Sequence, residues 1–312
     1  MPFISVVIPL YNKENYIKDT IESVLDQSFT DYELLIIDDC STDNSKRVAS
    51  QFADSRISIV THSTNKGLSA SRNTGIQNAA ADYIAFLDAD DLWKPNFLSE
   101  IHQLITDFPE ASLFATNYEE IIITNMIIPP ANSTQNFTKQ QLVSDYFMNS
   151  LQQPLYCHSS VCFKKDVFEN IGFYDETITY GEDVDFNIRA NLEYSLAYST
   201  HPFTQYLTNS ENQITQSNLS SKIITDFDYY EKNNPSNVSL KKFLDFQRYT
   251  KAKMYKMEGN SAKFHQLKKG ISLSNLNWKQ IILLYLPSFW LHQIKSWKLN
   301  KLKKGKRFTS YN

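Results

Sequence analysis

Tyr83-Ile-Ala-Phe-Leu-Asp-Ala-Asp-Asp91 is a short apolar run that ends abruptly in a group of carboxylates. The length and composition of Tyr83 to Leu87 predict a buried β-strand. In an extended chain, side chains at positions i and i+2 share a side, so we expect Asp88 and Asp90 to point together and Asp91 to point away. Two convergent carboxylates are oxygen ligands that favour the binding of Mg²⁺ or Mn²⁺. The alternative is a solvated acidic turn in which Asp91 caps the next helix.

Three further apolar runs precede this strand and are separated by helical patterns. We expect strands at 4–9, 33–38 and 56–60, and helices at 16–27, 45–53 and 68–80. This alternation predicts an α/β fold of Rossmann type, with a mostly parallel sheet flanked by helices. Ligands bind beyond the carboxyl ends of the strands in such sheets. Functional residues are therefore expected just after Pro9, Asp38, Val60 and Leu87.

The remainder of the chain mixes both kinds of element and then becomes helical. Helices are expected at 95–108, 139–148 and 182–194, and strands at 112–116 and 159–163. From about residue 217 the pattern is helical and increasingly basic. We therefore place a boundary near residue 216, with a helical C-terminal extension after it.

Side chains suited to a nucleotide follow the first three strands. Tyr11 offers an aromatic face to a nucleobase, or packs in an ordinary way. The Asp39 carboxylate can accept a hydrogen bond from a base imide or a ribose hydroxyl, whereas helix capping and an Asx turn suit Asp43 better. Lys66 and Arg72 can face a base, a ribose or a diphosphate, or remain solvated. Glycine-rich dinucleotide and P-loop motifs are missing from the sequence, which disfavours those sites.

Gly181-Glu-Asp-Val-Asp-Phe186 opens the last expected helix of the α/β part. Val184 begins an apolar stripe at helical spacing, and Asp183 lies about 100° away from that stripe, where it can face a cleft. An ionised carboxylate in a cleft is what the deprotonation of a hydroxyl group requires. The alternative for these acids is the capping of the helix N-terminus.

Charge is distributed unevenly along the chain. The formal net charge is −3, but the segment from Gly259 to the C-terminus has ten Lys, one Arg and no acid, so the first 258 residues carry 20 bases against 34 acids, about −14. Within the basic segment, an aromatic-rich apolar run at 281–291 is followed by most of the lysines. This pattern is typical of a helix lying in a membrane interface near anionic lipids. The alternatives are a helix packed on the core with a frayed end and, without support, nucleic-acid binding.

Cysteine usage and hydropathy bear on location. The three cysteines form no Cys-x-x-Cys motif, which favours a reducing compartment over a disulfide framework. No apolar stretch reaches the roughly 20 residues that a transmembrane helix needs. Together with the basic segment, these features predict a cytoplasmic protein that is peripheral on the inner face of the cell membrane.

As a set, the motifs resemble the family 2 inverting glycosyltransferases with the GT-A fold, of the bacterial surface-polysaccharide type. The resemblance covers about residues 3 to 215. It rests on Ser5-Val-Val-Ile-Pro-Leu-Tyr-Asn12, Ser23-Val-Leu-Asp-Gln-Ser28, Ile37-Asp-Asp-Cys-Ser-Thr-Asp43, Lys66-Gly-Leu-Ser-Ala-Ser-Arg-Asn73, Phe86-Leu-Asp-Ala-Asp-Asp91, Ile171-Gly-Phe-Tyr-Asp-Glu176 and Gly181-Glu-Asp-Val-Asp-Phe186. It implies a nucleotide-sugar-binding half at 1–95, an acceptor-binding half at 96–215 and the extension at 216–312.

The resemblance also implies roles for individual residues. The donor-binding set comprises Pro9, Tyr11 on the base, Asp39 accepting the base N–H, Lys66, Arg72 near the base, and Asp88 beside the ribose or the metal. Asp90, with Asp88, would hold Mn²⁺ or Mg²⁺. Asp183 would be the general base, and Glu182 would shape the acceptor pocket. One departure concerns a Tyr-Arg-x-His stretch of the family, which here reads Tyr206-Leu-Thr-Asn209 and puts phosphate or metal contacts from that loop in doubt.

The expected function is the transfer of a hexose or N-acetylhexosamine from a nucleoside-diphosphate sugar to a hydroxyl of a glycan or lipid-linked acceptor. A uracil or thymine imide would suit Asp39, so a UDP-sugar is favoured. The alternative is a non-catalytic protein that binds sugar nucleotides or glycans.

Overall fold

The computed structural model describes residues 1–123, 126–130, 134, 137–208, 210–211, 213–214 and 217–310. The N-terminal part alternates strands and helices as predicted: β1 (Ile4–Leu10), α1 (Ile17–Leu25), β2 (Tyr32–Asp38), α2 (Ser45–Ala49), β3 (Ile57–Thr61), α3 (Leu68–Asn78) and β4 (Tyr83–Phe86). These four strands are parallel and lie in the order β3-β2-β1-β4. The loops that follow β1, β2 and β4 are therefore brought to one edge of the sheet.

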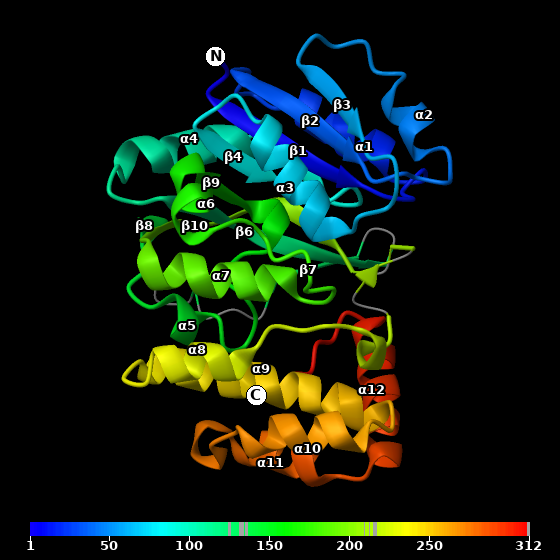
Figure 1. Cartoon of the computed structure of the whole chain (residues 1–312), viewed down its shortest axis with the longest axis vertical. Helices are drawn as coiled ribbons and strands as arrows, with labels where there is room; N and C mark the ends of the chain where they lie inside the picture. Colours follow the sequence, from blue (N-terminus) through cyan, green and yellow to red (C-terminus); the bar gives the residue numbers. More distant parts are fainter. Residues whose placement is uncertain are drawn as a thin grey trace.

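The second half of the sheet contains both parallel and antiparallel pairs. Its elements are β5 (Leu92–Trp93), α4 (Phe97–Asp107), β6 (Leu113–Ile123), β7 (Met126–Ile128), β8 (Gln140–Leu142), α5 (Tyr146–Asn149), the 3-10 turn η1 (His158–Ser160), β9 (Val161–Lys164), α6 (Lys165–Ile171), α7 (Glu182–Glu193) and β10 (Leu196–Leu207). The main path of the sheet continues β4-β9-β6-β10-β5, and β9 is antiparallel to both β4 and β6. Helices cover both faces, as Figure 1 shows, which confirms the predicted α/β class.

The helix predicted at 139–148 is wrong. Residues Gln140–Leu142 form β8, which pairs antiparallel with Ala197–Ser199 of β10. The helix α5 begins only after Asp145, whose side chain accepts a hydrogen bond from the Met148 backbone N–H. An exposed edge of β10 thus supplies tertiary hydrogen bonds that override the local helical pattern.

Two apolar cores lie on the two faces of the sheet. One contains Ile17 and Ile21 of α1 together with Phe97 and Ile101 of α4. The other joins α3, α6 and α7 to the strands. Close packing of α3 on β1 requires a glycine at position 75, because a Cβ there would lie 2.2 Å from the Val7 side chain.

The C-terminal extension stacks below the α7 side of the sheet domain (Figure 1). It contains η3 (Leu219–Ser221), α8 (Phe227–Asn233), α9 (Val238–Met257), α10 (Ser261–Lys269), η4 (Leu273–Asn275), α11 (Trp278–Tyr285) and α12 (Ser288–Leu302). The Phe243 ring of α9 packs on Tyr146 and Phe147 of α5, with centroid separations of 6.2 and 5.6 Å. The extension therefore shares a core with the sheet domain.

The segment that follows α12 contacts the sheet domain. After α12, Arg307 pairs with Glu120 of β6 and donates to the Gln153 Oε1 atom at 2.6 Å. Trp297 and Phe308 pack with centroids 4.8 Å apart. No helix in the described part of the chain is long and apolar enough to cross a membrane.

Candidate active site

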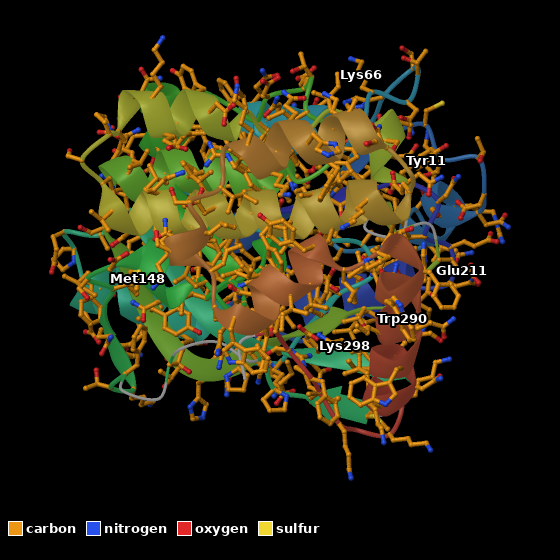
Figure 2. All side chains as sticks on the ribbon, turned by 90° about the horizontal axis from the view of Figure 1, so that it is seen from below. Tyr11, Lys66, Met148, Glu211, Trp290 and Lys298 are labelled. Carbon is orange, nitrogen blue, oxygen red and sulfur yellow. The ribbon has the colours of Figure 1, made fainter. Side chains whose placement is uncertain are left out.

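The loop after β1 places Tyr11 at the open edge of the sheet. Asn12, which adopts a left-handed conformation at φ +50°, donates from Nδ2 to the Thr42 hydroxyl at 3.1 Å and accepts from the Thr42 backbone N–H at 2.8 Å. These bonds tie the loops after β1 and β2 together. The Tyr11 side chain remains 41% exposed. Figure 2 shows Tyr11 and Lys66 on the same side of the molecule. Pro9 is buried within β1.

Asp39 is held in place by the loop that follows β3. Its Oδ1 atom accepts from the Lys66 backbone N–H at 2.8 Å and lies 2.7 Å from Nδ1 of His62, while Oδ2 accepts from the Gly67 N–H at 2.7 Å. Gly67 has φ +92°, a conformation that a side chain would strain. A carboxylate offers about four acceptor positions, so room for one further donor remains. Lys66 thus acts here through its backbone, and its side chain is exposed.

The acidic motif after β4 is a turn and not an extension of the strand. The Asp91 N–H donates to the Asp88 carbonyl at 3.0 Å, and β4 ends at Phe86. The argument that alternation places Asp88 and Asp90 on one side therefore fails, although the two carboxylates are close enough to interact electrostatically. Asp91 does not cap α4. It accepts from the Ser159 hydroxyl and from the Leu207 N–H at 2.9 Å, which fixes the turn to β10.

Asp90 is paired with a lysine that the sequence patterns did not single out. The Lys13 ammonium lies 2.7 Å from Asp90 Oδ2 and donates to the Ser210 hydroxyl at 3.0 Å and the Glu211 carbonyl at 2.6 Å. Ser210 also donates to Asp90. Lys13 and Asp90 have side-chain exposures of only 11% and 9%. A cation of the chain itself therefore pairs with Asp90.

Arg72 joins the acidic turn to the beginning of α7. Its guanidinium contacts Asp88 Oδ1 at 3.0 Å and Glu182 Oε1 at 2.7 Å, and only 2% of its side chain is exposed. The guanidinium also lies over the Tyr174 ring, 5.5 Å from its centroid. The neighbouring Asn73 exchanges hydrogen bonds of 3.0 Å with the Tyr174 backbone in both directions. The structure thus brings Asp88 and the Glu182-Asp183 pair to one place, as predicted.

The three acids at the start of α7 have different surroundings. Glu182 is paired with Arg72. Asp185 is buried, accepts from the Tyr230 hydroxyl at 2.6 Å and pairs with Arg189 at 3.0 Å. Asp183 is half-buried, accepts only from the Val184 N–H at 2.9 Å and has no ion pair with a described residue. Of these three acids, Asp183 is therefore the one that is left available to a ligand.

Burial dominates the titration of the two carboxylates around Arg72. It raises the pKa of Asp88, against the lowering effect of Arg72, and the charge of Asp90 raises it further. Burial likewise raises the pKa of Glu182, with Arg72 opposing and Asp183 contributing in the same direction. The same interactions raise the Arg72 pKa against its burial. Two carboxylates thus share one guanidinium at a low-dielectric edge, an arrangement that a cationic ligand would stabilise.

The donor set fits a divalent metal only if the substrate supplies further ligands. Among the described residues, no group of three or more His, Cys, Asp or Glu side chains is arranged to hold a metal. Asp90 and the free oxygen of Asp88 offer two carboxylates. Mg²⁺ is often held by one or two carboxylates together with substrate phosphates. The residues present therefore fit a metal that Asp90 and Asp88 would hold together with the oxygens of a diphosphate.

The loop after β10 approaches the site despite its departure from the family pattern. Tyr206 and Leu207 complete β10, while Asn209 lies outside the described residues. Ser210 and the Glu211 carbonyl contact Lys13, which makes this loop a neighbour of Asp90. With His62, Lys13 and Ser210 are the site residues that the sequence patterns missed. Their only signal is position, since each follows the carboxyl end of a strand.

A sequence comparison identifies the family. The sequence model named Glycosyl transferase family 2 matches residues 5–172, which is more than half of the chain. The chain belongs to glycosyl transferase family 2. The matched region contains the turn with Asp88 and Asp90 but ends before Asp183.

Curated relatives of this family 2 protein match it over part of their length. It is 44% identical over 101 residues to TuaG of Bacillus subtilis (strain 168), whose name assigns it provisionally to teichuronic acid biosynthesis, with 32% of this chain and 40% of TuaG covered. It is 37% identical over 143 residues to WfgD of Escherichia coli, named a UDP-Glc:alpha-D-GlcNAc-diphosphoundecaprenol beta-1,3-glucosyltransferase, with 46% of this chain and 55% of WfgD covered. The matches thus span about half the length of these relatives.

The family 2 chain also resembles a solved structure over most of its length. The crystal structure of Staphylococcus aureus TarS in complex with UDP-GlcNAc covers 90% of this chain and 78% of that chain, with a TM-score of 0.60 and 17% identity. This likeness supports the GT-A fold.

Proposed function

We propose that this family 2 protein is an inverting glycosyltransferase of cell-surface polysaccharide synthesis. It would transfer a hexose or N-acetylhexosamine from a nucleoside-diphosphate sugar to a hydroxyl of a glycan or lipid-linked acceptor. The observation that carries the proposal is the Asp88–Arg72–Glu182 bridge, which joins the donor edge of the sheet to the helix that bears the unpaired Asp183. A protein that only bound sugar nucleotides would not need an unpaired carboxylate at that point.

The chain's own residues would perform three tasks in the reaction. Tyr11 and Asp39 would hold the base, with the remaining acceptor position of Asp39 receiving an imide N–H. Asp183 would take the proton from the acceptor hydroxyl as its oxygen attacks the anomeric carbon from the face opposite the leaving diphosphate. This single displacement inverts the anomeric centre and needs no enzyme nucleophile. Arg72 would hold the acidic turn after β4 and the start of α7 in fixed positions relative to each other during the transfer.

Asp90 and Asp88 would hold Mn²⁺ or Mg²⁺ together with the donor diphosphate. When bound, such an ion neutralises the charge that develops on the leaving group. Lys13, which pairs with Asp90, would supply a second cation near the diphosphate. The identity of the nucleotide as UDP is supported by the donor in the name of WfgD and by the UDP-GlcNAc complex of TarS.

The experiment that tests this proposal measures transfer with purified protein, a panel of UDP-sugars and Mn²⁺. Asp183→Asn should lower kcat by about 10² to 10⁴, because it removes the general base, while donor affinity stays within about twofold. Glu193→Gln is the matched control, since Glu193 is an exposed carboxylate at the other end of α7. Near-normal turnover of Asp183→Asn would contradict the assignment of the base.

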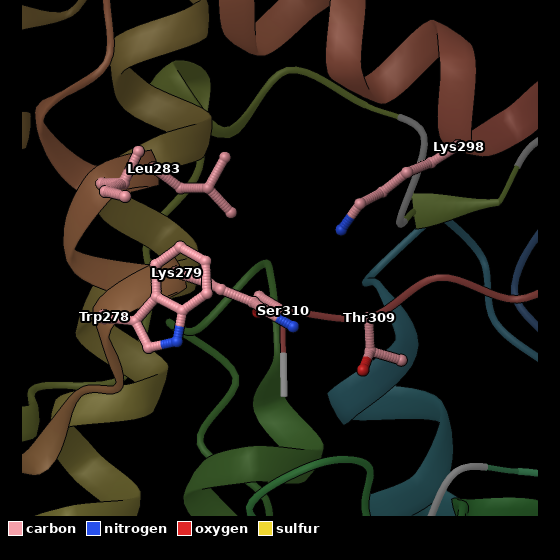
Figure 3. Close-up of a pocket in the computed structure, with 7 residues that line it drawn as sticks. Trp278, Lys279, Leu283, Lys298, Thr309 and Ser310 are labelled. Carbon is pink, nitrogen blue, oxygen red and sulfur yellow. The ribbon is translucent and has the colours of Figure 1, made fainter. Parts of the chain in front are cut away.

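Membrane contact through the C-terminal extension is a second part of the proposal. Large apolar side chains are exposed along α11 and α12, among them Trp278, Phe289 and Trp290 at 68%, 62% and 55%. Trp278 also lines a pocket of about 240 Å³, toward which Lys298 reaches in Figure 3. The pocket is lined by Trp278, Lys279, Ile282, Leu283, Lys298, Thr309 and Ser310. Aromatic side chains next to lysines match the apolar and anionic layers of a lipid surface.

Flotation with vesicles that contain phosphatidylglycerol tests this contact. The double variant Phe289→Ser and Trp290→Ser should lose most of the bound fraction. Tyr229→Ser should not, because Tyr229 is equally exposed but lies on α8. Equal binding of the double variant and the unaltered protein would refute the contact.

A further inference from the structure

His62, the first residue after β3, is a buried histidine inside the edge of the sheet that would bind the base. Its backbone N–H donates to the Asp38 carbonyl at 2.9 Å, which extends the pairing of β2 and β3 by one residue. Only 5% of its side chain is exposed. The imidazole is therefore packed inside this edge, where it can act on a nucleotide through the residues that it contacts.

Both ring nitrogens of His62 have a partner. Nδ1 lies 2.7 Å from Asp39 Oδ1, and Nε2 lies 2.9 Å from the Thr74 hydroxyl on α3. Because an ionised carboxylate can only accept hydrogen bonds, the proton between His62 and Asp39 belongs to Nδ1. The Thr74 hydroxyl holds the other end of the ring, so the imidazole is kept turned toward Asp39.

Thr74 belongs to a helix that is also anchored at the acidic turn. Two positions before it on α3 is Arg72, which pairs with Asp88 and Glu182 at 3.0 and 2.7 Å. One short helix therefore positions both the partner of the His62 ring and the guanidinium that bridges the acidic turn to α7.

The contacts with described residues leave one acceptor position open on Asp39. A carboxylate has about four such positions, two on each oxygen. Oδ1 receives the His62 ring and the Lys66 backbone N–H at 2.8 Å, while Oδ2 receives only the Gly67 N–H at 2.7 Å. Without the imidazole, an acceptor position would open on Oδ1 as well. His62 therefore confines the free acceptor position of Asp39 to Oδ2.

We propose that His62 is a positioning residue for nucleotide recognition, which makes the site select a base that presents a ring N–H. This inference rests on the proposed function, because it takes Asp39 as the group that binds the base. Uracil presents an N–H at N3, whereas cytosine presents a bare lone pair there beside an amino group. A single fixed acceptor pairs with the uracil N–H and is repelled by the cytosine lone pair. A carboxylate with open positions on both oxygens could instead accept from the cytosine amino group.

Calorimetry of UDP and CDP binding in the presence of Mn²⁺ tests the role of His62. His62→Leu should weaken UDP binding about tenfold or more and CDP binding by less than about threefold, so that the preference for UDP narrows. His62→Asn should keep most of the UDP affinity, because its side-chain amide places an N–H donor close to the position of Nδ1. In transfer assays, His62→Leu should raise KM for the UDP-sugar and leave kcat within about twofold.

Two further variants separate this role from general stability. Thr74→Val removes the partner of Nε2 and should narrow the preference for UDP in the same direction as His62→Leu, which keeps the inference testable if His62→Leu does not fold. The control His102→Leu removes a ring that packs on Phe3 and Phe29 from α4 and should leave both affinities unchanged. Thermal unfolding checks that each variant is folded.

The outcomes distinguish this inference from the proposed function. If the unaltered protein binds UDP in the predicted His62-dependent way but transfers no sugar, the inference stands and the proposed function fails. If His62→Leu loses UDP and CDP affinity by the same factor or loses neither, or if His62→Asn recovers no UDP affinity, the inference is overturned.

Discussion

Replacement of Arg72 by Met should destabilise the protein strongly and in a pH-dependent way. Arg72 is 2% exposed and is the partner of both Asp88 and Glu182, at 3.0 and 2.7 Å. Removing one partner of a buried ion pair costs about 3 to 5 kcal/mol, because the remaining charge stays in a medium of low dielectric constant. Native domains are stable by only about 5 to 15 kcal/mol, so the loss would take a large share of the total.

The pH dependence follows from the Glu182 carboxyl. Burial raises its pKa and Arg72 lowers it, so in Arg72→Met the pKa rises further. The unfolded chain releases this proton near the ordinary value of 4.5, whereas the folded variant retains it to higher pH. Between these values the folded state binds more protons, so its stability falls as pH rises. The free-energy deficit of Arg72→Met relative to the unaltered protein should therefore be larger at pH 7.5 than at pH 5.5.

Urea unfolding followed by circular dichroism at both pH values measures the deficit. Adding Glu182→Gln to Arg72→Met should recover about 2 kcal/mol, because the buried charge is then gone. The control Arg47→Met replaces an exposed arginine of α2 and should stay within about 0.5 kcal/mol. A loss below about 1 kcal/mol, with no dependence on pH and no recovery in the double variant, would refute the reasoning.

Two further predictions concern Asp90 and Lys253. Asp90→Ala should abolish the increase in UDP affinity that Mn²⁺ produces, as measured by calorimetry. The control Asp107→Ala removes an exposed carboxylate of α4 and should leave that increase in place. An unchanged Mn²⁺ effect in Asp90→Ala would exclude Asp90 as a metal ligand. Burial lowers the pKa of Lys253 to about 8 from 10.5, with Lys298 contributing. The unfolded chain thus binds the proton that the folded chain loses between these values, so stability should rise with pH there. Lys253→Met should remove this rise and increase the free energy of unfolding by about 1 to 3 kcal/mol at pH 7, measured by urea unfolding. If the variant kept the same dependence of stability on pH, the pKa of Lys253 would not be its cause.

The parts of the fold set by local pattern were predictable, and the parts set by distant contacts were not. Strands β1, β2 and β4 are buried over nearly all of their length and read as continuous apolar runs. Gln140–Leu142 carries no such run and becomes a strand only because the edge of β10 is available. Asp88 and Asp90 were predicted to lie close together because the chain was expected to be extended there. The chain forms a turn instead, and the two carboxylates are close for that different reason.

The site shows the same division. Asp183 was singled out by its place on a helix, and it forms no ion pair with any residue that the structure describes. Lys13 carried no signal, because one flexible cation among 31 basic residues is not distinguishable until the fold shows what it contacts. Arg72 was placed near the base, whereas its position between two carboxylates depends on residues far apart in the sequence.

The hydrogen bonds between Thr179–Tyr180 and Ile223 have a consequence for exchanging parts between family members. The family match ends at residue 172, before the start of α7. The segment before α7, η3 and α9 are linked by these main-chain bonds and by a shared apolar cluster. A hybrid enzyme built from two relatives should therefore inherit its acceptor preference only when that whole block is transplanted intact, with the join placed before α7 and not at the sheet–helix boundary.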